Sequence, residues 1–408
     1  MLLRGATLLT MVPGASPRRC DLRIIDRRIA AIGELTAEPG EAQVELNGRT
    51  ICPGFVQGHV HLCQTLFRGQ AEDLPLLDWL QTRIWPLEHG HDQASLRKSA
   101  ELTLREFACS GVTSFQSIES VRGTRYILEE IAATPMRAIV AASLVDLDEA
   151  IYPPGFASSS QEALDETEAL QADWDGFEGR IEIAYGPRFL LSCSEDLLRQ
   201  LGQRRAAGAR IHTHASEHPG ELAAVEARFG KRYIEALADF DLLGPSTGLA
   251  HCVHVDPHEE DLLVQSDTAV LHCPSTNLKL GSGIARVHDF LRRGLRIALG
   301  SDGAPANNRL DMLTELRSAA LLQKLVAGEA ALSAEDALAL ATREGARALG
   351  LGDECGTLEP GKSADLVVFD LEDPLLGEEA SPYTKLVYAA SRAHITGVMA
   401  RGEWILPA

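Results

Sequence analysis

Residues 54–61 read GFVQGHVH, an apolar stretch that ends in two histidines separated by one residue. Its length and composition predict a buried β-strand. Seven similar stretches follow, each before a helix-compatible segment such as residues 194–207 or 311–326. We predict the eight strands at residues 54–61, 112–118, 137–144, 180–185, 209–214, 248–251, 269–272 and 296–300. Strands that alternate with helices indicate parallel βαβ units, and eight units over about 300 residues favour an α/β fold of the (β/α)8 TIM-barrel type.

Short strands also occupy both ends of the chain, separated by Gly, Pro and charged turns. We predict them at residues 22–25, 28–32, 365–369, 395–399 and 404–406. Neither end has enough apolar residues for a core of its own. The sequence therefore predicts a small β-sandwich domain formed from both termini, residues 1–52 and 356–408, around a barrel at residues 53–355.

The chain has 408 residues and a formal net charge of −20, from 38 Lys+Arg and 58 Asp+Glu. This excess of negative charge disfavours DNA, RNA and anionic membranes as partners. No apolar run approaches the roughly 20 residues of a membrane helix, and Arg4, Gly5 and Thr7 interrupt the first apolar stretch, which favours a strand over a signal peptide. The eight cysteines are scattered without a CxxC pair, so we expect a protein of the reducing cytoplasm.

Polar side chains collect at the ends of four predicted strands, which is where a barrel carries its active site. His59 and His61 lie on the same face of the first strand because side chains alternate along a strand. The other strand ends contribute His212 and His214, then His251, then Asp302. A single histidine there would be an ordinary core residue, but histidine or aspartate at the ends of four strands predicts a metal centre. Three imidazoles and one carboxylate leave a divalent ion, zinc or iron, with an open position for an activated water, so we expect hydrolysis or deamination.

Three of these residues are candidates for moving protons. Glu217 stands three residues beyond His214, where it could carry a proton from the water to a ring nitrogen and then to the leaving group. The alternative for Glu217 is a solvated acid in the first turn of a helix. His251 could orient the water or polarise the reacting carbon, and Asp302 could serve both as ligand and as general base.

Several strings resemble a known family. PGFVQGHVH, HTHASE, GLAHCVHV and GSDG are similar to segments of the amidohydrolase superfamily. LFRGQAEDLPLLDWLQTRIWPLE, NLKLGSGIARVHDFL and GSDGAPANNRLDML resemble the deaminases of S-adenosylhomocysteine, 5′-methylthioadenosine and 5′-deoxyadenosine, in the branch that also holds guanine deaminases and triazine hydrolases. The resemblance implies a proton shuttle at Glu217, a helper at His251 and metal ligands at His59, His61, His214 and Asp302.

The resemblance also bears on the substrate. Glu88, in the string WPLE, matches the carboxylate with which nucleoside deaminases of this family hold the ribose hydroxyls, although a glutamate in a loop is usually solvated. Family members that accept S-adenosylhomocysteine carry two arginines for its carboxylate, one of them on the third strand. Here Ala142 stands at that position and no arginine lies between Ser143 and Arg180. A buried carboxylate without such a partner is costly, so we expect S-adenosylhomocysteine to be a poor substrate.

Two further residues do not decide whether the substrate base is adenine or guanine. Arg188 follows the fourth strand, where adenosine-type deaminases commonly have histidine, and it resembles the arginine that guanine deaminases use on their purine. Gln64 matches a ring-recognising glutamine of guanine deaminases, and triazine hydrolases have glutamine there too. An arginine can donate to N3, N7 or O6 of a purine, so both aminopurine alternatives stay open. A structural salt bridge at the barrel mouth is the other role for Arg188.

The remaining histidines divide into two groups. We expect His212 and His272 to support the metal ligands through hydrogen bonds. Surface or helix-capping roles are expected for His89, His91, His218, His254, His258, His288 and His394.

Together these features predict a metal-dependent hydrolytic deaminase of an aminopurine. The leading substrate is an adenine nucleoside with a small neutral 5′ group: 5′-deoxyadenosine, 5′-methylthioadenosine or adenosine. The alternatives are guanine or a related oxopurine, and a chloro- or amino-triazine. The expected cofactor is one divalent metal, the expected partner is the small-molecule substrate, and a homo-oligomer is compatible with the resemblance. A barrel that only binds a ligand is disfavoured by the intact metal set.

Overall fold

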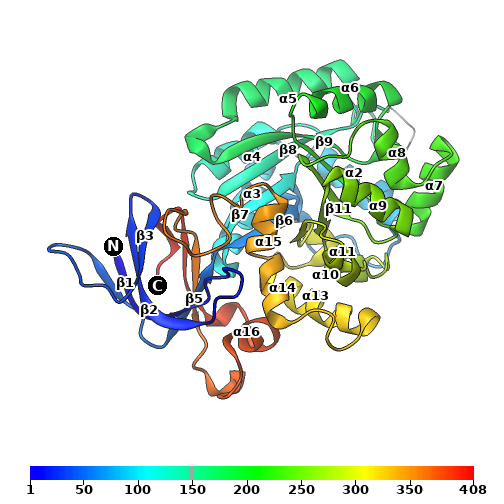
Figure 1. Ribbon diagram of the computed structural model, residues 1–408. Coiled ribbons are helices and arrows are strands. Elements are labelled where there is room, and N and C mark those ends of the chain that lie inside the picture. The colour runs from blue at the N-terminus through cyan, green and yellow to red at the C-terminus, as the bar shows by residue number, and fades with distance from the viewer. Residues whose placement is uncertain (148–150) are drawn as a thin grey trace.

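The computed structural model describes residues 1–147 and 151–408 (Figure 1). Eight parallel strands form one sheet in sequence order, from β6 to β13. Its strands are β6 (Phe55–Val60), β7 (Val112–Ile118), β8 (Arg137–Leu144), β9 (Ile181–Pro187), β10 (Ile211–Ala215), β11 (Thr247–His251), β12 (Ala269–His272) and β13 (Ile297–Leu299). The two ends of this sheet meet where the Asp302 N–H donates to the His59 carbonyl at 3.0 Å. The prediction of a (β/α)8 barrel is confirmed.

The predicted strands are all present, with small shifts at their ends. The second, third and seventh have the predicted limits, whereas the fourth continues to Pro187 because Gly186 and Pro187 still pair with Ser143 and Leu144 of β8. The fifth begins two residues later than predicted, at Ile211. These shifts leave the polar strand ends at the same rim of the barrel.

Helices follow the strands and cover the outside of the barrel (Figure 1). The predicted helices 194–207 and 311–326 correspond to α6 (Glu195–Ala206) and α13 (Met312–Ala327), and Ser194 caps the first of them by accepting the Leu197 N–H. The other helices of the barrel are α3 (Gln93–Ser110), α4 (Thr124–Ala132), α5 (Ser160–Trp174), α7 (Pro219–Phe229), α8 (Tyr233–Asp239), α9 (Pro257–Ser266), α10 (Pro274–Lys279), α11 (Val287–Arg292), α12 (Ala304–Asn307), α14 (Ala334–Leu340) and α15 (Arg343–Ala348). Between β6 and α3 the chain forms α1 (Leu76–Trp79), a π-helical turn (Leu80–Ile84) and α2 (Trp85–His89). Among the described residues, no helix is both long and apolar enough to cross a membrane.

The two ends of the chain build a second sheet, as predicted (Figure 1). This mixed sheet has the order β16-β15-β14-β5-β1-β2-β3, with β4 beside β1. Its strands are β1 (Leu2–Leu8), β2 (Arg18–Ile25), β3 (Arg28–Gly33), β4 (Gln43–Glu45), β5 (Arg49–Pro53), β14 (Leu366–Asp370), β15 (Ile395–Ala400) and β16 (Glu403–Leu406). The antiparallel pairing of β5 with β14 joins the two termini. The exact domain limits, 1–52, 53–355 and 356–408, stay a prediction.

A buried polar contact fastens this sheet to the base of the barrel. Arg137, at the start of β8, lies 3.1 Å from the Asp365 carboxylate, and both side chains are buried. The same carboxylate accepts the Arg401 N–H at 2.9 Å. The opposite rim of the barrel stays open for the polar strand ends.

Candidate active site

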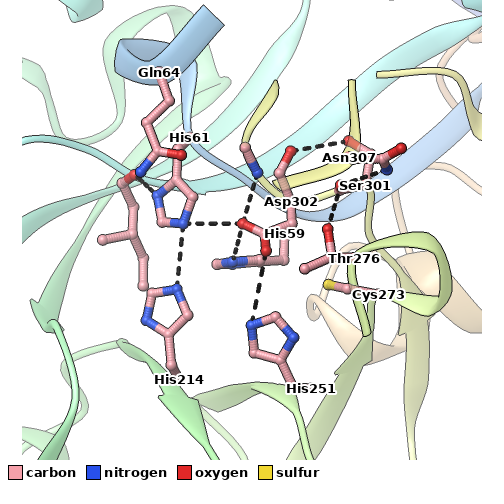
Figure 2. A network of polar contacts seen from close by, with 12 residues as sticks. His59, His61, Gln64, His214, His251, Cys273, Thr276, Ser301, Asp302 and Asn307 are labelled. Atoms are coloured by element: carbon pink, nitrogen blue, oxygen red, sulfur yellow. Dashed lines mark hydrogen bonds and ion pairs between the residues drawn. The ribbon is translucent and has the colours of Figure 1, made fainter. Parts of the chain in front are cut away.

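Four side chains from three strand ends converge at the open rim of the barrel (Figure 2). His59 and His61 come from the end of β6, His214 from β10, and Asp302 from the segment after β13. Their ligand atoms all lie within 4.8 Å of one another. Asp302 Oδ1 is 3.4 Å from His59 Nε2 and 3.2 Å from His61 Nε2. The structure thus brings together the four residues proposed from the sequence as ligands.

The orientation of the histidine rings shows whether a cation fits between them. His61 Nδ1 lies 2.6 Å from the Ile118 carbonyl, and His214 Nδ1 lies 2.6 Å from the Arg188 carbonyl. A carbonyl only accepts, so both Nδ1 atoms carry the proton and the two Nε2 atoms, 3.2 Å apart, present lone pairs. Two ligand nitrogens held at roughly 2.0–2.1 Å from one zinc ion in tetrahedral geometry stand about 3.3 Å apart. The donor set therefore fits a divalent cation between the rings.

Burial keeps the rings in the protonation state that binds a metal. It lowers the pKa of His59 to about 4 and the pKa of His214 well below its ordinary range. His59 Nδ1 is 2.9 Å from His212 Nε2, so His212 orients His59 as expected. His272 differs from expectation: neither of its ring nitrogens has a hydrogen-bond partner among the described residues. Burial, with a smaller contribution from His251, lowers the pKa of His272 to about 3, so the ring is neutral.

Asp302 is fixed by its own backbone and by its neighbours. It has a left-handed conformation, with φ of 60°, and its Oδ1 accepts the Gly303 N–H at 2.6 Å. Burial alone would raise the pKa of Asp302, but His59 and His61 hold it well below its ordinary range. The preceding residue, Ser301, is held by Gln57, which accepts its N–H at 2.8 Å and donates to its hydroxyl at 2.6 Å. Asp302 is therefore an ionised, preoriented carboxylate.

Glu217 and His251 lie beside the proposed ligands. Glu217 Oε2 is 3.5 Å from His251 Nε2, and the same nitrogen is 4.0 Å from Asp302 Oδ2. His251 Nδ1 donates to Asn277 Oδ1 at 2.9 Å, which leaves Nε2 facing the two carboxylates. Burial, with a further contribution from Asp302, raises the pKa of Glu217 well above its ordinary range. A buried carboxyl with a raised pKa is suited to hold a proton and donate it to a neighbouring group.

A second polar cluster contains the proposed substrate-binding residues. Glu88 lies in helix α2 and is 4% exposed, so it is not a solvated loop glutamate, and its burial is compatible with the substrate-binding role predicted from its motif. Its Oε1 is 2.9 Å from Arg188 Nη2 and accepts from Gln64 Nε2 at 2.8 Å. Glu88 Oε2 and Gln64 Oε1 are buried without hydrogen-bond partners in the described part of the chain. Arg188 thus forms the salt bridge foreseen as one of its roles, and two acceptor oxygens are left for a ligand.

One cavity at the barrel mouth joins the proposed ligands to Gln64 and Arg188 of the second cluster, whereas Glu88 lines a neighbouring cavity with His89 and His91. The apolar walls of the first cavity come from Leu76, Trp79, Leu80, Phe189 and Leu280. Its polar lining comprises His61, Gln64, Arg188, His214, Glu217, Glu221, His251 and Asp302.

Two contributors were not identified from the sequence, Glu221 in the cavity wall and Asn277 behind His251. Asn277 lies inside the NLKLGSG string, so that string is the one signal that could have indicated it.

The other histidines have structural roles. His218 caps α7, His91 contacts the Cys63 carbonyl at 2.8 Å, and His254 contacts the Ser282 carbonyl at 2.6 Å. His288 contacts the Ala331 carbonyl.

Comparison with known proteins agrees with this geometry. The model of the amidohydrolase family matches residues 50–405. The 5-methylthioadenosine/S-adenosylhomocysteine deaminase of Pelotomaculum thermopropionicum is 34% identical over 422 aligned positions, covering 100% of this chain and 93% of the relative. The 5′-deoxyadenosine deaminase of Methanothermobacter thermautotrophicus is 35% identical over 393 positions, covering 95% and 90%. An adenosine deaminase from Xanthomonas campestris, solved with bound zinc, is 30% identical with a TM-score of 0.93, covering 100% and 92%.

Proposed function

The chain belongs to the amidohydrolase family and is a hydrolytic deaminase, and from this premise we propose that its substrate is an adenine nucleoside with a small neutral 5′ group. The reaction would add water at C6 of the base and release ammonia, leaving an inosine-type product. The observation that carries this proposal is the pair Gln64 and Glu88: Gln64 lines the cavity that holds the convergent histidines and donates to the buried Glu88, whose Oε2 has no hydrogen-bond partner among the described residues. The names of the relatives, a 5-methylthioadenosine/S-adenosylhomocysteine deaminase and a 5′-deoxyadenosine deaminase, support an adenine nucleoside.

The cofactor is one divalent metal, zinc or iron, and we assign its ligands as His59, His61, His214 and Asp302. When bound, the cation supplies Lewis-acid activation of water. The protein supplies ligands whose tautomers are already set by backbone carbonyls, so no rearrangement precedes binding.

Proton transfers are assigned to the groups around the cavity. Glu217, protonated in its buried position, would donate to the ring nitrogen beside C6 and, after recovering a proton from the attacking water, to the departing amino group. His251, 4.0 Å from Asp302, would orient that water, and Asp302 would accept the second proton of the water and return it to Glu217 once ammonia has left. The overall balance is nucleoside plus water giving the oxo product plus ammonia.

Glu88 and Gln64 would bind the ribose. Their free oxygens, Glu88 Oε2 and Gln64 Oε1, accept hydrogen bonds, and ribose hydroxyls can donate to both. The cation in the cavity lining, Arg188, is already paired with Glu88. An anionic 5′ tail would therefore meet no unpaired cation among the described lining residues, and S-adenosylhomocysteine should be a poor substrate.

A second candidate substrate is guanine or a related oxopurine. Arg188 is 3% exposed in the cavity wall beside Gln64, so it could donate to a ring carbonyl. Only the nucleoside proposal requires Glu88 to hold a ribose.

Ammonia release from the metal-loaded enzyme tests both proposals. We expect turnover of 5′-deoxyadenosine, 5′-methylthioadenosine or adenosine, and at least about 100-fold lower kcat/KM for S-adenosylhomocysteine, the effect of roughly 3 kcal/mol for an unpaired buried charge. Glu88→Gln should lower kcat/KM for the nucleosides and leave that for any free base unchanged. Turnover of guanine alone would replace the first proposal with the second, and no ammonia from any of these compounds would contradict both.

Two further properties, the cellular environment and the binding partners, accompany this function. All eight cysteines are free thiols, which supports our proposal of a reducing, cytoplasmic environment. The small-molecule substrate is the proposed partner, and a homo-oligomer remains compatible with it.

A further inference from the structure

The segment that carries Glu217 is a strained turn between β10 and α7. Ser216 is buried in a left-handed conformation, with φ of 52°, which a residue with a side chain adopts only when its surroundings impose it. The Ser216 carbonyl accepts the N–H groups of Val253 at 2.9 Å and His254 at 3.0 Å. One side of the turn is thus fixed by the loop after β11.

The carboxyl group of Glu217 has few restraints of its own. Its Oε1 has no hydrogen-bond partner among the described residues, and its Oε2 makes only the 3.5 Å contact with His251. The backbone N–H of Glu217 donates to Glu221 Oε2 at 2.9 Å. The location of the Glu217 carboxyl therefore depends on how its backbone is held, and Glu221 is the side chain that holds it.

Glu221 differs from an ordinary acid in the first turn of a helix. Such an acid normally stays in water and stabilises the positive end of its own helix. Glu221 is 2% exposed, lines the cavity, and reaches back beyond the helix cap His218 to Glu217. Glu226, on the same helix, is exposed.

The surroundings of Glu221 favour a neutral carboxyl. Burial and the nearby Glu217 carboxyl raise the pKa of Glu221 to about 7, against smaller lowering contributions from the Glu217 backbone N–H, His251 and Tyr233. The Tyr233 hydroxyl donates to the His214 carbonyl at 3.0 Å and accepts the Leu190 N–H at 3.1 Å. Glu221 can thus support Glu217 without a full second negative charge in the cavity.

We propose that Glu221 is the positioning residue of the proton carrier Glu217, because its carboxyl oxygen anchors the Glu217 backbone and so sets the distance from the Glu217 carboxyl to the substrate ring. The inference rests on the proposed function, in which Glu217 protonates the ring. Misplacement by about 1 Å of a group that acts in the chemical step can reduce the rate about 100-fold. Loss of the anchor should therefore lower kcat roughly 10- to 100-fold and leave KM within about twofold.

Four variants of the full-length, metal-loaded enzyme test the role. Glu221→Gln keeps an acceptor oxygen and removes the charge, whereas Glu221→Met keeps the approximate volume and removes the acceptor. Glu221→Asp keeps the charge but withdraws the acceptor by one methylene. Glu226→Gln, on the exposed face of the same helix, is the matched control. For each variant we would measure kcat and KM with the best nucleoside of the wild type, bound metal by elemental analysis, and the melting temperature.

We expect Glu221→Gln and Glu226→Gln to keep kcat within about threefold of the wild type, and Glu221→Met and Glu221→Asp to lose at least about tenfold in kcat with metal content unchanged. If one of the last two fails to fold, the other decides. Wild-type kcat in a folded acceptor-displaced variant would overturn the role of Glu221, as would a Glu221→Gln variant as slow as Glu221→Met. A wild type that deaminates no nucleoside would instead refute the proposed function.

Discussion

Replacing Arg188 should destabilise the protein far more than replacing an arginine of an exposed ion pair. Arg188 and Glu88 have side chains that are 3% and 0% exposed. The Arg188→Met variant leaves the Glu88 carboxylate buried, with Gln64 as its one remaining donor among the described residues. Removing one partner of a buried ion pair costs about 3–5 kcal/mol, mostly because the other charge is left uncompensated. The double variant Arg188→Met/Glu88→Met removes both charges, so it should recover most of that loss.

Urea denaturation of the four members of this double-mutant cycle measures the coupling. We expect each single variant to lose about 3–5 kcal/mol of unfolding free energy and the coupling energy to be about 3 kcal/mol. The matched control is Arg199→Met, whose partner Glu195 is one helical turn away, with side chains 60% and 58% exposed. That variant should change stability by no more than about 0.5 kcal/mol. If Arg188→Met costs no more than the control, the buried pair is not what holds Glu88, and the reasoning about the substrate cluster is wrong.

Three further predictions concern other parts of the molecule. Burial raises the pKa of Glu315 to about 7, above its ordinary value of 4.5, so the stability from its neutral form is complete below pH 4.5 and is lost as the pH rises through 7. Because the pKa of Glu221 is raised in the same way, urea titrations between pH 5 and 9 should show a loss up to about 3 kcal/mol larger for the wild type than for Glu315→Gln, and equal slopes would contradict this. Zinc at about 100 times its dissociation constant should stabilise the metal-free wild type by about 2.7 kcal/mol in thermal melts and should not stabilise His214→Ala. A wild-type melting temperature that does not change with zinc would argue against the assigned ligands. Gly303→Ala would place its Cβ 1.9 Å from Gln64 Oε1 and so displace the Gln64 amide. We expect the nucleoside KM to rise about tenfold with little effect on the melting temperature. An unchanged KM would show that Gln64 does not bind the ribose.

The barrel and the cluster of proposed metal ligands were predictable because both depend on local patterns. Alternation along a strand is enough to place His59 and His61 on one face, and the common rim of a parallel barrel is enough to bring His214 and Asp302 to them. The resemblance of the residue strings to the family then selected these four residues from the other polar residues at the strand ends. None of this requires knowledge of how helices pack on the sheet.

The features that local patterns did not show depend on such packing. Glu88 was assigned to the substrate site by its motif alone, because no local pattern shows that the π-helical turn and α2 bury this residue. Glu221 occupies a position where acids are common for helix stability, so its burial becomes visible only when α7 is seen against the cavity. His272 lies at a strand end as predicted, but its hydrogen-bonding depends on neighbours from other strands, which leave its nitrogens unpartnered in the described structure.

Arg188 links the metal side and the substrate side of the cavity through two different parts of one residue. Its backbone carbonyl accepts the proton of His214 Nδ1 at 2.6 Å, while its guanidinium lies 2.9 Å from Glu88. The first contact needs only the main chain and survives any side chain at this position, whereas the second requires an arginine. The arrangement of the proposed ligands can therefore stay the same while the side chain at position 188 varies. This explains why the four proposed ligands are all present here although residue 188 is arginine and not the histidine common in adenosine-type deaminases. Substrate preference can change at this position without disturbing the orientation of the ligand that the same residue supports.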